Sequence, residues 1–434
     1  MAENIARALA EFALGAGPPE TALAMMRLSV FDWMACGAAG SGQPVARAVR
    51  SMIAGEGGSD EASAFGLRDR VPARSAALVN GAAGHALDFD DTHFAHIGHP
   101  SVTAVPAALA VAERCRAPGA TMLAAALIGA EASIRVGIWL GRSHYQAGFH
   151  QTSTAGTFGA ALAAARLLRL DPATTANALG LASTRASGLK SQFGTMGKPY
   201  NAGVAAANGV EASLLAAAGM VSDPGALDGD QGFGPTHAGE ADTSALDGLG
   251  TNWLFETVSH KFHACCHGTH AALEALTQVR GGVEPAEVAV VTIRTHPRWL
   301  SVCDIAGPTT GLAAKFSFRL TAAMALAGRD TAAMTTFSDA ACADPQLVAL
   351  RDLVRVETDK RLPETAARVT LRKRDGSERV AAHDLAAPMA MGVRTAKLKA
   401  KAVALIGSDR AERAWQAVDA GPDADELARF VRAT

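Results

Sequence analysis

The stretch Val288-Ala289-Val290-Val291-Thr292-Ile293-Arg294-Thr295-His296 decides the fold class, because it interrupts a chain that otherwise has helical periodicity. Its β-branched residues are typical of a strand. Two further strand-like runs cover residues 353–358 and 367–372, and the Asp-Gly pair at 375–376 predicts a hairpin after the second of them. The sequence therefore predicts a small α/β domain over residues 262–388.

The regions on either side of this domain are predicted to be helical. Alanine-rich windows there carry apolar residues at steps of three and four, which is typical of helices. The clearest windows are Ala22–Gly37, Val102–Arg116, Thr121–Gly141, Ala155–Leu168 and Val204–Gly219. The predicted fold class is mainly α: a large all-helical domain built from both chain ends (1–261 and 389–434) and a smaller α/β lid domain (262–388).

Length and composition narrow the class of protein. With 434 residues the chain exceeds the usual size of a single core, so two domains are expected. Hydrophobic residues make up 49% and charged residues 19%, and the net charge is −2. Nothing in this balance favours nucleic acid or a membrane surface as a partner. No basic-apolar leader and no apolar run of about 20 residues is found, so neither a signal peptide nor a membrane span is expected. The six cysteines are scattered and fit reduced thiols better than a disulfide framework, so a cytoplasmic location is expected.

The segment from Asp88 to His99 is unusually polar for this chain. The spacing of His93, His96 and His99 would suit a metal on one helix face, but it matches no standard zinc signature, and Gly98 predicts a loop there. Solvated histidines in a turn are the simplest alternative. A metal-free acid/base site is favoured, because the following helix start would attract an anion beside His99.

Three more clusters could carry chemistry, and each also has a purely structural interpretation. His150 lies in a hydroxyl-rich loop and could be a helix cap. Lys198, between Gly197 and Pro199, could bind a carboxylate as a point charge or be a solvated loop lysine. Residues 261–270 combine histidines with adjacent cysteines, so zinc, a thiolate nucleophile, helix-start histidines and an acid/base group all stay open. Together these groups suit removal of a proton from carbon next to a carboxylate.

The motifs, taken in order, resemble those of the MmgE/PrpD family along nearly the whole chain. The pieces that carry the resemblance are His85–Thr92 with His99-Pro100-Ser101, Gly148–Gly156, Gly197-Lys198-Pro199, Ala207–Ala212, Lys261–His267 and Ala314–Arg319. The resemblance implies the helical domain and lid described above, a homodimer, and an active site between the domains that needs no metal and no other cofactor.

The resemblance also implies roles for six residues. His99 and His150 would be the leading acid/base groups, and His267 a further catalytic histidine. Lys198 and Thr92 would hold carboxylate or hydroxyl groups of a small polycarboxylate substrate. Asp88 would line the substrate site and orient a neighbouring group.

Four functions are compatible with these residues. The first is a cofactor-independent lyase that dehydrates a 2-methylcitrate-like hydroxy polycarboxylate, and the second is an epimerase of an acidic substrate such as iminodisuccinate. Decarboxylation of a cis-aconitate-type substrate ranks third. The resemblance implies a tyrosine in the decarboxylase branch at the position where this chain has Leu320, and leucine donates no proton. A non-catalytic binding protein with the inherited fold ranks fourth.

Overall fold

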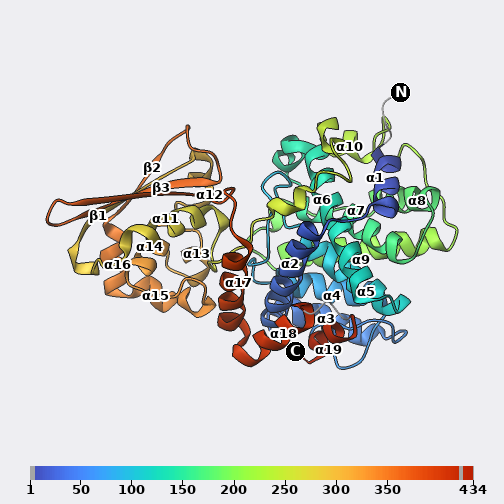
Figure 1. Ribbon diagram of the computed structural model, residues 1–434, viewed down its shortest axis with the longest axis horizontal. Coiled ribbons are helices and arrows are strands. Elements are labelled where there is room, and N and C mark those ends of the chain that lie inside the picture. Colours follow the sequence, from blue (N-terminus) through green and yellow to red (C-terminus); the bar gives the residue numbers. More distant parts are fainter. Residues whose placement is uncertain (1–4, 420–423, 434) are drawn as a thin grey trace. The chain divides into compact units, whose positions relative to one another are not determined.

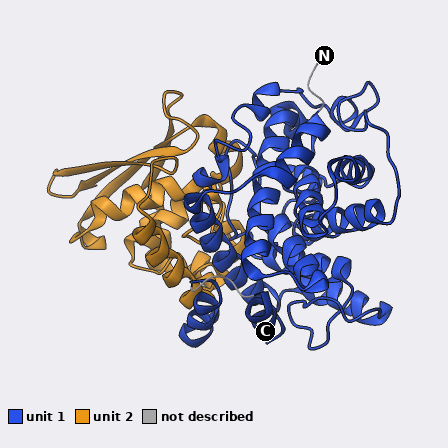
Figure 2. Cartoon of the chain, turned by 45° about the vertical axis from the view of Figure 1, so that its right-hand side comes forward, with its two compact units in different colours: residues 1–260, 406–434 blue, residues 261–405 orange. Residues whose placement is uncertain are grey.

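Helices make up most of the structure, a computed structural model that describes residues 5–419 and 424–433 (Figure 1). The chain divides into unit 1, residues 1–260 and 406–434, and unit 2, residues 261–405 (Figure 2). The mainly α prediction is confirmed. The sequence assigned residues 389–405 to the helical domain, whereas contacts group them with unit 2.

Within its described residues, the regular elements of unit 1 are helices, and its β-structure is limited to isolated bridges. Its α-helices are α1 (Ile5–Gly15), α2 (Glu20–Gly40), α3 (Pro44–Glu56), α4 (Ala73–His85), α5 (Ser101–Cys115), α6 (Gly119–Ala147), α7 (Gln151–Leu167), α8 (Pro172–Ser183), α9 (Gly197–Ala217), α10 (Phe233–Thr236), α18 (Ser408–Asp419) and α19 (Ala424–Arg432). Three short 3-10 helices join them: η1 (Lys190–Gln192), η2 (Thr243–Leu246) and η3 (Leu254–Thr257).

Helix α7 is the centre of unit 1. Every residue of α7 except Arg166 is buried, and the helix contacts α5, α6 and α9. A helix that is apolar or small on all sides is the expected choice for such a position. Small residues let the backbones approach: a Cβ on Gly159 would lie 2.2 Å from the Gly129 carbonyl oxygen on α6. Close packing therefore fixes the position of α7 against α6.

Unit 2 is built on a four-stranded sheet. The strands β1 (Val288–Thr295), β2 (Val354–Thr358), β3 (Ala366–Lys373) and β4 (Glu378–Asp384) lie in the order β2-β1-β3-β4. Strands β1 and β2 are parallel, and the other two pairs are antiparallel. All three strand-like runs and the Asp-Gly hairpin predicted from the sequence are confirmed, with Val380 paired to Thr370.

Helices of unit 2 cover this sheet, with α11 against β3 and β4 and with α14 and α16 against β2 (Figure 1). Its α-helices are α11 (His270–Arg280), α12 (Leu300–Cys303), α13 (Gly311–Ala314), α14 (Phe318–Leu326), α15 (Asp339–Ala343), α16 (Pro345–Asp352) and α17 (Met391–Ile406, whose last residue is counted with unit 1). The 3-10 helices are η4 (His267–Thr269), η5 (Pro285–Glu287), η6 (Pro297–Trp299) and η7 (Met334–Thr336).

Two helices, α2 and α6, are long and apolar enough to cross a membrane by length and composition alone. In the folded chain 78% of the α2 window and 89% of the α6 window are buried against other parts of the protein. Core helices have this same character, so the two helices are weak evidence for a membrane span.

The close approach of α6 and α7 predicts that Gly159→Ala destabilises the protein. The added methyl would collide with the Gly129 carbonyl oxygen and with Ser133 Oγ, so the free energy of unfolding should fall by about 1–3 kcal/mol. Gly55→Ala is the matched control: Gly55 is exposed on α3 with nothing within 4 Å of the new methyl, and alanine should stabilise that helix by about 0.5–1 kcal/mol. Urea unfolding measures both. Equal effects at the two sites would contradict this account of the packing.

Candidate functional site

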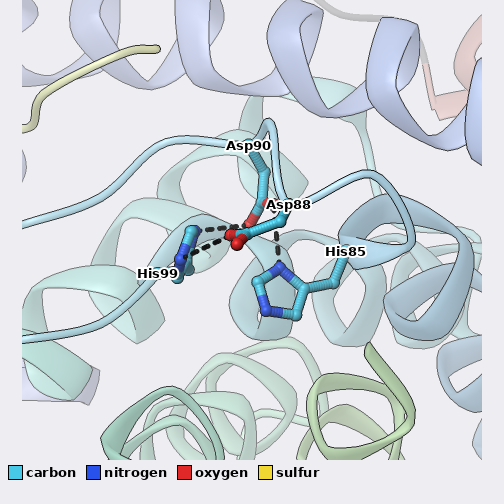
Figure 3. Close-up of side chains that lie close together, drawn as sticks. All are labelled: His85, Asp88, Asp90 and His99. Carbon is cyan, nitrogen blue, oxygen red and sulfur yellow. Dashed lines mark hydrogen bonds and ion pairs between the residues drawn. The ribbon is translucent and has the colours of Figure 1, made fainter. Parts of the chain in front are cut away.

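The loop between α4 and α5 brings two histidines and two aspartates together (Figure 3). His85 Nδ1 donates a hydrogen bond of 2.8 Å to Asp90 Oδ1, and His99 Nδ1 lies 3.0 Å from Asp90 Oδ2. On its other side, His99 Nε2 lies 3.4 Å from Asp88 Oδ1. His85, Asp90 and His99 are buried, and the Asp88 side chain is 38% exposed.

Backbone conformation turns this loop back on itself. Asp88 has a φ of 51° and Ile97 a φ of 53°, in the left-handed region that non-glycine residues rarely adopt. For a β-branched residue such as Ile97 this is a true outlier, and such strain concentrates at functional sites. The loop is anchored by the His93 N–H, which donates to the Gly98 carbonyl, and by the His99 N–H, which donates to Thr152 Oγ1.

Lys198 extends the cluster. Its Nζ lies 2.7 Å from Asp88 Oδ2, so one carboxylate contacts both the lysine and His99. The sequence placed Lys198 ahead of a helix, whereas it occupies the first turn of α9. The ammonium also lies 5.5 Å from the centre of the Phe193 ring. A cation in this position can bind a carboxylate of a ligand.

His150 completes the group of predicted residues that lie near one another. It is the residue immediately before α7, so the predicted hydroxyl-rich loop after it is in fact the first turn of that helix. The His150 ring stacks at 6.0 Å from the His85 ring and meets Phe193 edge to face at 5.0 Å. Burial and then the nearby Lys198 charge hold the pKa of His150 well below its usual value, so the ring is neutral at neutral pH.

Three helix N-termini supply these side chains. His99 lies two residues before α5, His150 directly precedes α7, and Lys198 is the second residue of α9. Each helix start places the positive end of the helix dipole near these side chains. The arrangement favours anions around these residues.

Asp90 is the most buried charge of the cluster. Burial alone would raise the pKa of Asp90, but the charges and hydrogen bonds of His85 and His99 outweigh burial and hold it well below its usual range. The carboxylate is therefore ionised. The neighbouring Asp91 differs: burial raises the pKa of Asp91 to about 7, and its carboxylate accepts hydrogen bonds from Ser101.

The same four side chains, His85, Asp88, Asp90 and His99, could also hold a metal ion, since one ligand atom from each lies within 4.8 Å of the others. Two imidazoles and two carboxylates are suitable donors for several divalent metals. Against this, both oxygens of Asp90 already face imidazole nitrogens, and the ammonium of Lys198 contacts Asp88. The geometry favours an ion-pair network, and the sequence-based expectation of a metal-free site stays a prediction.

The two remaining predicted residues are not joined to this network by the contacts described above. Thr92 pairs through its backbone with Ser259, and its hydroxyl lies 3.4 Å from the Ser259 carbonyl. His267 begins η4 in unit 2, where its ring packs on His270 at 4.8 Å. Their roles in substrate binding and catalysis stay predictions.

No role is predicted from the sequence for His85, Asp90 or Asn201. His85 and Asp90 belong to the His85–Thr92 motif, but their pairing depends on the turn at Asp88, which the sequence does not reveal. Asn201 Nδ2 lies 3.4 Å from His150 Nδ1 and 3.5 Å from the Leu189 carbonyl oxygen. Because a carbonyl can only accept, the amide nitrogen faces both groups, and His150 Nδ1 is an acceptor. His150 then carries its proton on Nε2.

Comparison with known proteins assigns the family. The MmgE/PrpD N-terminal domain matches residues 3–245, and the MmgE/PrpD C-terminal domain matches residues 263–420. The chain belongs to the MmgE/PrpD family.

Similar curated proteins are named as decarboxylases. The chain is 33% identical over 218 residues to the cis-aconitate decarboxylase of Homo sapiens, which is 49% of this chain and 45% of that protein. It is 32% identical over 232 residues to the cis-aconitate decarboxylase of Aspergillus terreus, 50% of this chain and 47% of the other. The chain is also 31% identical over 282 residues to a cis-aconitate decarboxylase-like protein of Aspergillus oryzae, which is 60% of this chain and 58% of that protein. The chain thus spans about half the length of the curated relatives it matches.

Buried histidines next to this site predict acid sensitivity. Burial lowers the pKa of His93 to about 4 and that of His96 to about 3. Their folded pKa lies below the unfolded value of about 6.5, so their contribution to stability is complete above pH 6.5 and lost as the pH falls further. Between pH 7.5 and 5 each should reduce the free energy of unfolding by about 2 kcal/mol.

His96→Leu tests this prediction, because both ring nitrogens of His96 are buried without a hydrogen-bond partner. The variant should unfold at pH 7.5 in no less urea than the wild type, and it should lose less stability at pH 5. The same pH dependence in both proteins would show that His96 does not titrate as described.

Proposed function

We propose that this protein is a lyase that acts on a small polycarboxylate by moving a proton at the carbon next to a carboxylate. The observation that carries the proposal is Asp88, whose carboxylate lies between His99 and Lys198. His99, a proton-transfer group, and Lys198, a cation for a substrate carboxylate, therefore contact the same side chain. Membership of the MmgE/PrpD family supports the same class of reaction.

The two histidines have different surroundings, which suggests different roles. His99 stands between two carboxylates, so positive charge that forms on its ring is stabilised as it takes up the substrate proton. His150 is neutral and presents its Nε2–H, which suits a hydrogen bond to a developing negative charge or delivery of a proton to a leaving group. Lys198 and the three helix N-termini would hold the substrate carboxylates.

Dehydration is the first candidate reaction. His99 takes the proton from carbon, the electron pair forms the new double bond, and the hydroxide leaves from the adjacent carbon with a proton from a second group, giving water. The side chain of Leu320 is fully buried in α14 and offers no proton donor at the position where the resemblance to the decarboxylase branch implies a tyrosine. A 2-methylcitrate-like substrate fits this reaction.

Decarboxylation is the second candidate, because the relatives above are named as cis-aconitate decarboxylases. In that reaction the carbon–carboxylate bond breaks, carbon dioxide leaves, and a proton is delivered to carbon as the double bond shifts. The same imidazoles could deliver the proton. Epimerisation of an acidic substrate would remove the α-proton from one face and return a proton to the same carbon on the opposite face, with no elimination.

Substitution at His99 and Lys198 tests the proposal. The purified full chain should act on 2-methylcitrate or cis-aconitate, and His99→Gln should reduce kcat at least 100-fold because a proton-transfer group is removed. Lys198→Met should raise KM more than it lowers kcat, because it removes a cation for the substrate. Proton NMR in deuterated buffer measures alkene formation, carbon dioxide loss and α-hydrogen exchange together.

The products decide between the candidate reactions. A new alkene with water loss supports dehydration, loss of a carboxylate supports decarboxylation, and α-hydrogen exchange without either supports an epimerase. The control is Arg361→Met, which removes a charge from an exposed side chain of unit 2 paired only with Asp359 among its described ion pairs. Binding of polycarboxylates without turnover by the wild type would contradict the proposal.

A further inference from the structure

Asp90 links two imidazole rings inside unit 1 and is not itself exposed to substrate. Its side chain is 2% exposed, and the side chains of His85 and His99 are 0% and 9% exposed. Its two oxygens are divided between the rings, with 2.8 Å to His85 Nδ1 and 3.0 Å to His99 Nδ1. Asp88, by contrast, is half-buried and contacts Lys198. The two aspartates that flank His99 therefore have different surroundings.

The ionised carboxylate of Asp90 fixes where the protons lie on both rings. An ionised carboxylate only accepts hydrogen bonds, so the Nδ1 atom of each ring must carry a hydrogen to interact favourably with it. For His99 this leaves Nε2, whose contact with the half-buried Asp88 is longer at 3.4 Å, as the nitrogen that exchanges a proton. Nε2 is also the atom on the side of Asp88 and Lys198, where the proposed substrate would bind.

His85 holds the other half of Asp90 in place. It is the last residue of α4, and its ring meets the His99 ring edge to face at 4.5 Å. Its Nδ1 donates a hydrogen bond to Asp90 Oδ1, so Asp90 Oδ2 faces His99. The 3.0 Å approach of Oδ2 to His99 is not aligned as a full hydrogen bond. Such contacts commonly tighten only when substrate binds.

We propose that Asp90 and His85 form a buried positioning pair that holds His99 in the tautomer with Nδ1 protonated and Nε2 available for proton transfer. The inference rests on the proposed function, since it gives His99 its role in that reaction. Asp90 acts through His99 and touches no substrate atom. The arrangement follows the logic by which a buried aspartate orients the histidine of a hydrolase triad, with the difference that a second imidazole shares the carboxylate.

The experiment combines substrate-free NMR with kinetics. Nitrogen-15 spectra of the imidazoles, assigned by comparison with His99→Gln, report which ring nitrogen of His99 carries hydrogen. In the wild type Nδ1 should be protonated. In Asp90→Asn the amide presents a different hydrogen-bonding group to His99, so the Nε2-protonated tautomer should increase, and kcat should fall at least 100-fold with KM changed less than threefold.

Two further variants make the test specific. Asp91→Asn is the matched control: Asp91 is the adjacent buried aspartate, it bonds to Ser101 rather than to a histidine, and the amide resembles its protonated form. It should leave the His99 tautomer unchanged and kcat within a factor of three. His85→Gln keeps a donor for Asp90 and should retain more activity than His85→Phe, which leaves one oxygen of Asp90 without its donor.

The outcomes separate this proposal from the proposed function. An unchanged His99 tautomer in folded Asp90→Asn overturns the positioning pair, whatever the activity. Equal losses in Asp90→Asn and Asp91→Asn, without a tautomer change, would indicate a structural role only. Absence of turnover in the wild type contradicts the proposed function, while the tautomer still decides the pairing. The wild type could instead bind Zn²⁺ stoichiometrically, require it for turnover, and lose it in Asp90→Asn. That result would overturn the positioning pair in favour of a metal site.

Discussion

The ionised carboxylate of Asp90, shared between two imidazoles in the interior of unit 1, is the interaction on which the rest of the site depends. An isolated buried carboxylate would be costly, and here its interactions with the imidazole rings of His85 and His99 offset that cost. The carboxylate in turn orients both rings. Because His85 ends α4 and His99 precedes α5, the interaction also sets the path of the loop that joins the two helices.

Helix packing gives that interaction its setting. Glycine and alanine along α6, α7 and α9 allow the backbones to approach, and this close packing holds in place the helices that begin next to His150 and at Gly197, one residue before Lys198. Proton-transfer groups at helix starts are held by rigid elements rather than by loop side chains alone. The same helix starts place the positive ends of their dipoles near these side chains, so the helices both position the side chains and favour negative charge around them.

Much of this could be predicted from the sequence, because periodicity and β-branched runs report local structure directly. The runs at 288–296 and 367–372 became strands, and His99, His150, Lys198 and Asp88 lie near one another as the motifs suggested. The Asp90–His85 pairing could not be predicted, because it depends on the left-handed turn at Asp88. The grouping of residues 389–405 with unit 2 depends likewise on tertiary contacts that periodicity does not encode.

The charge balance of the cluster bears on how a substrate would enter. Lys198 is already paired with Asp88 at 2.7 Å, so an incoming carboxylate must share the ammonium or displace Asp88 from it. Asp88 is suited to be the group that yields, because its side chain is 38% exposed and its backbone lies in the left-handed region. Asp90 is suited to stay, because it is buried between two imidazoles. In the proposed reaction, Asp88 would therefore give way to the incoming anion, and Asp90 would keep the His99 ring oriented while the anion reacts.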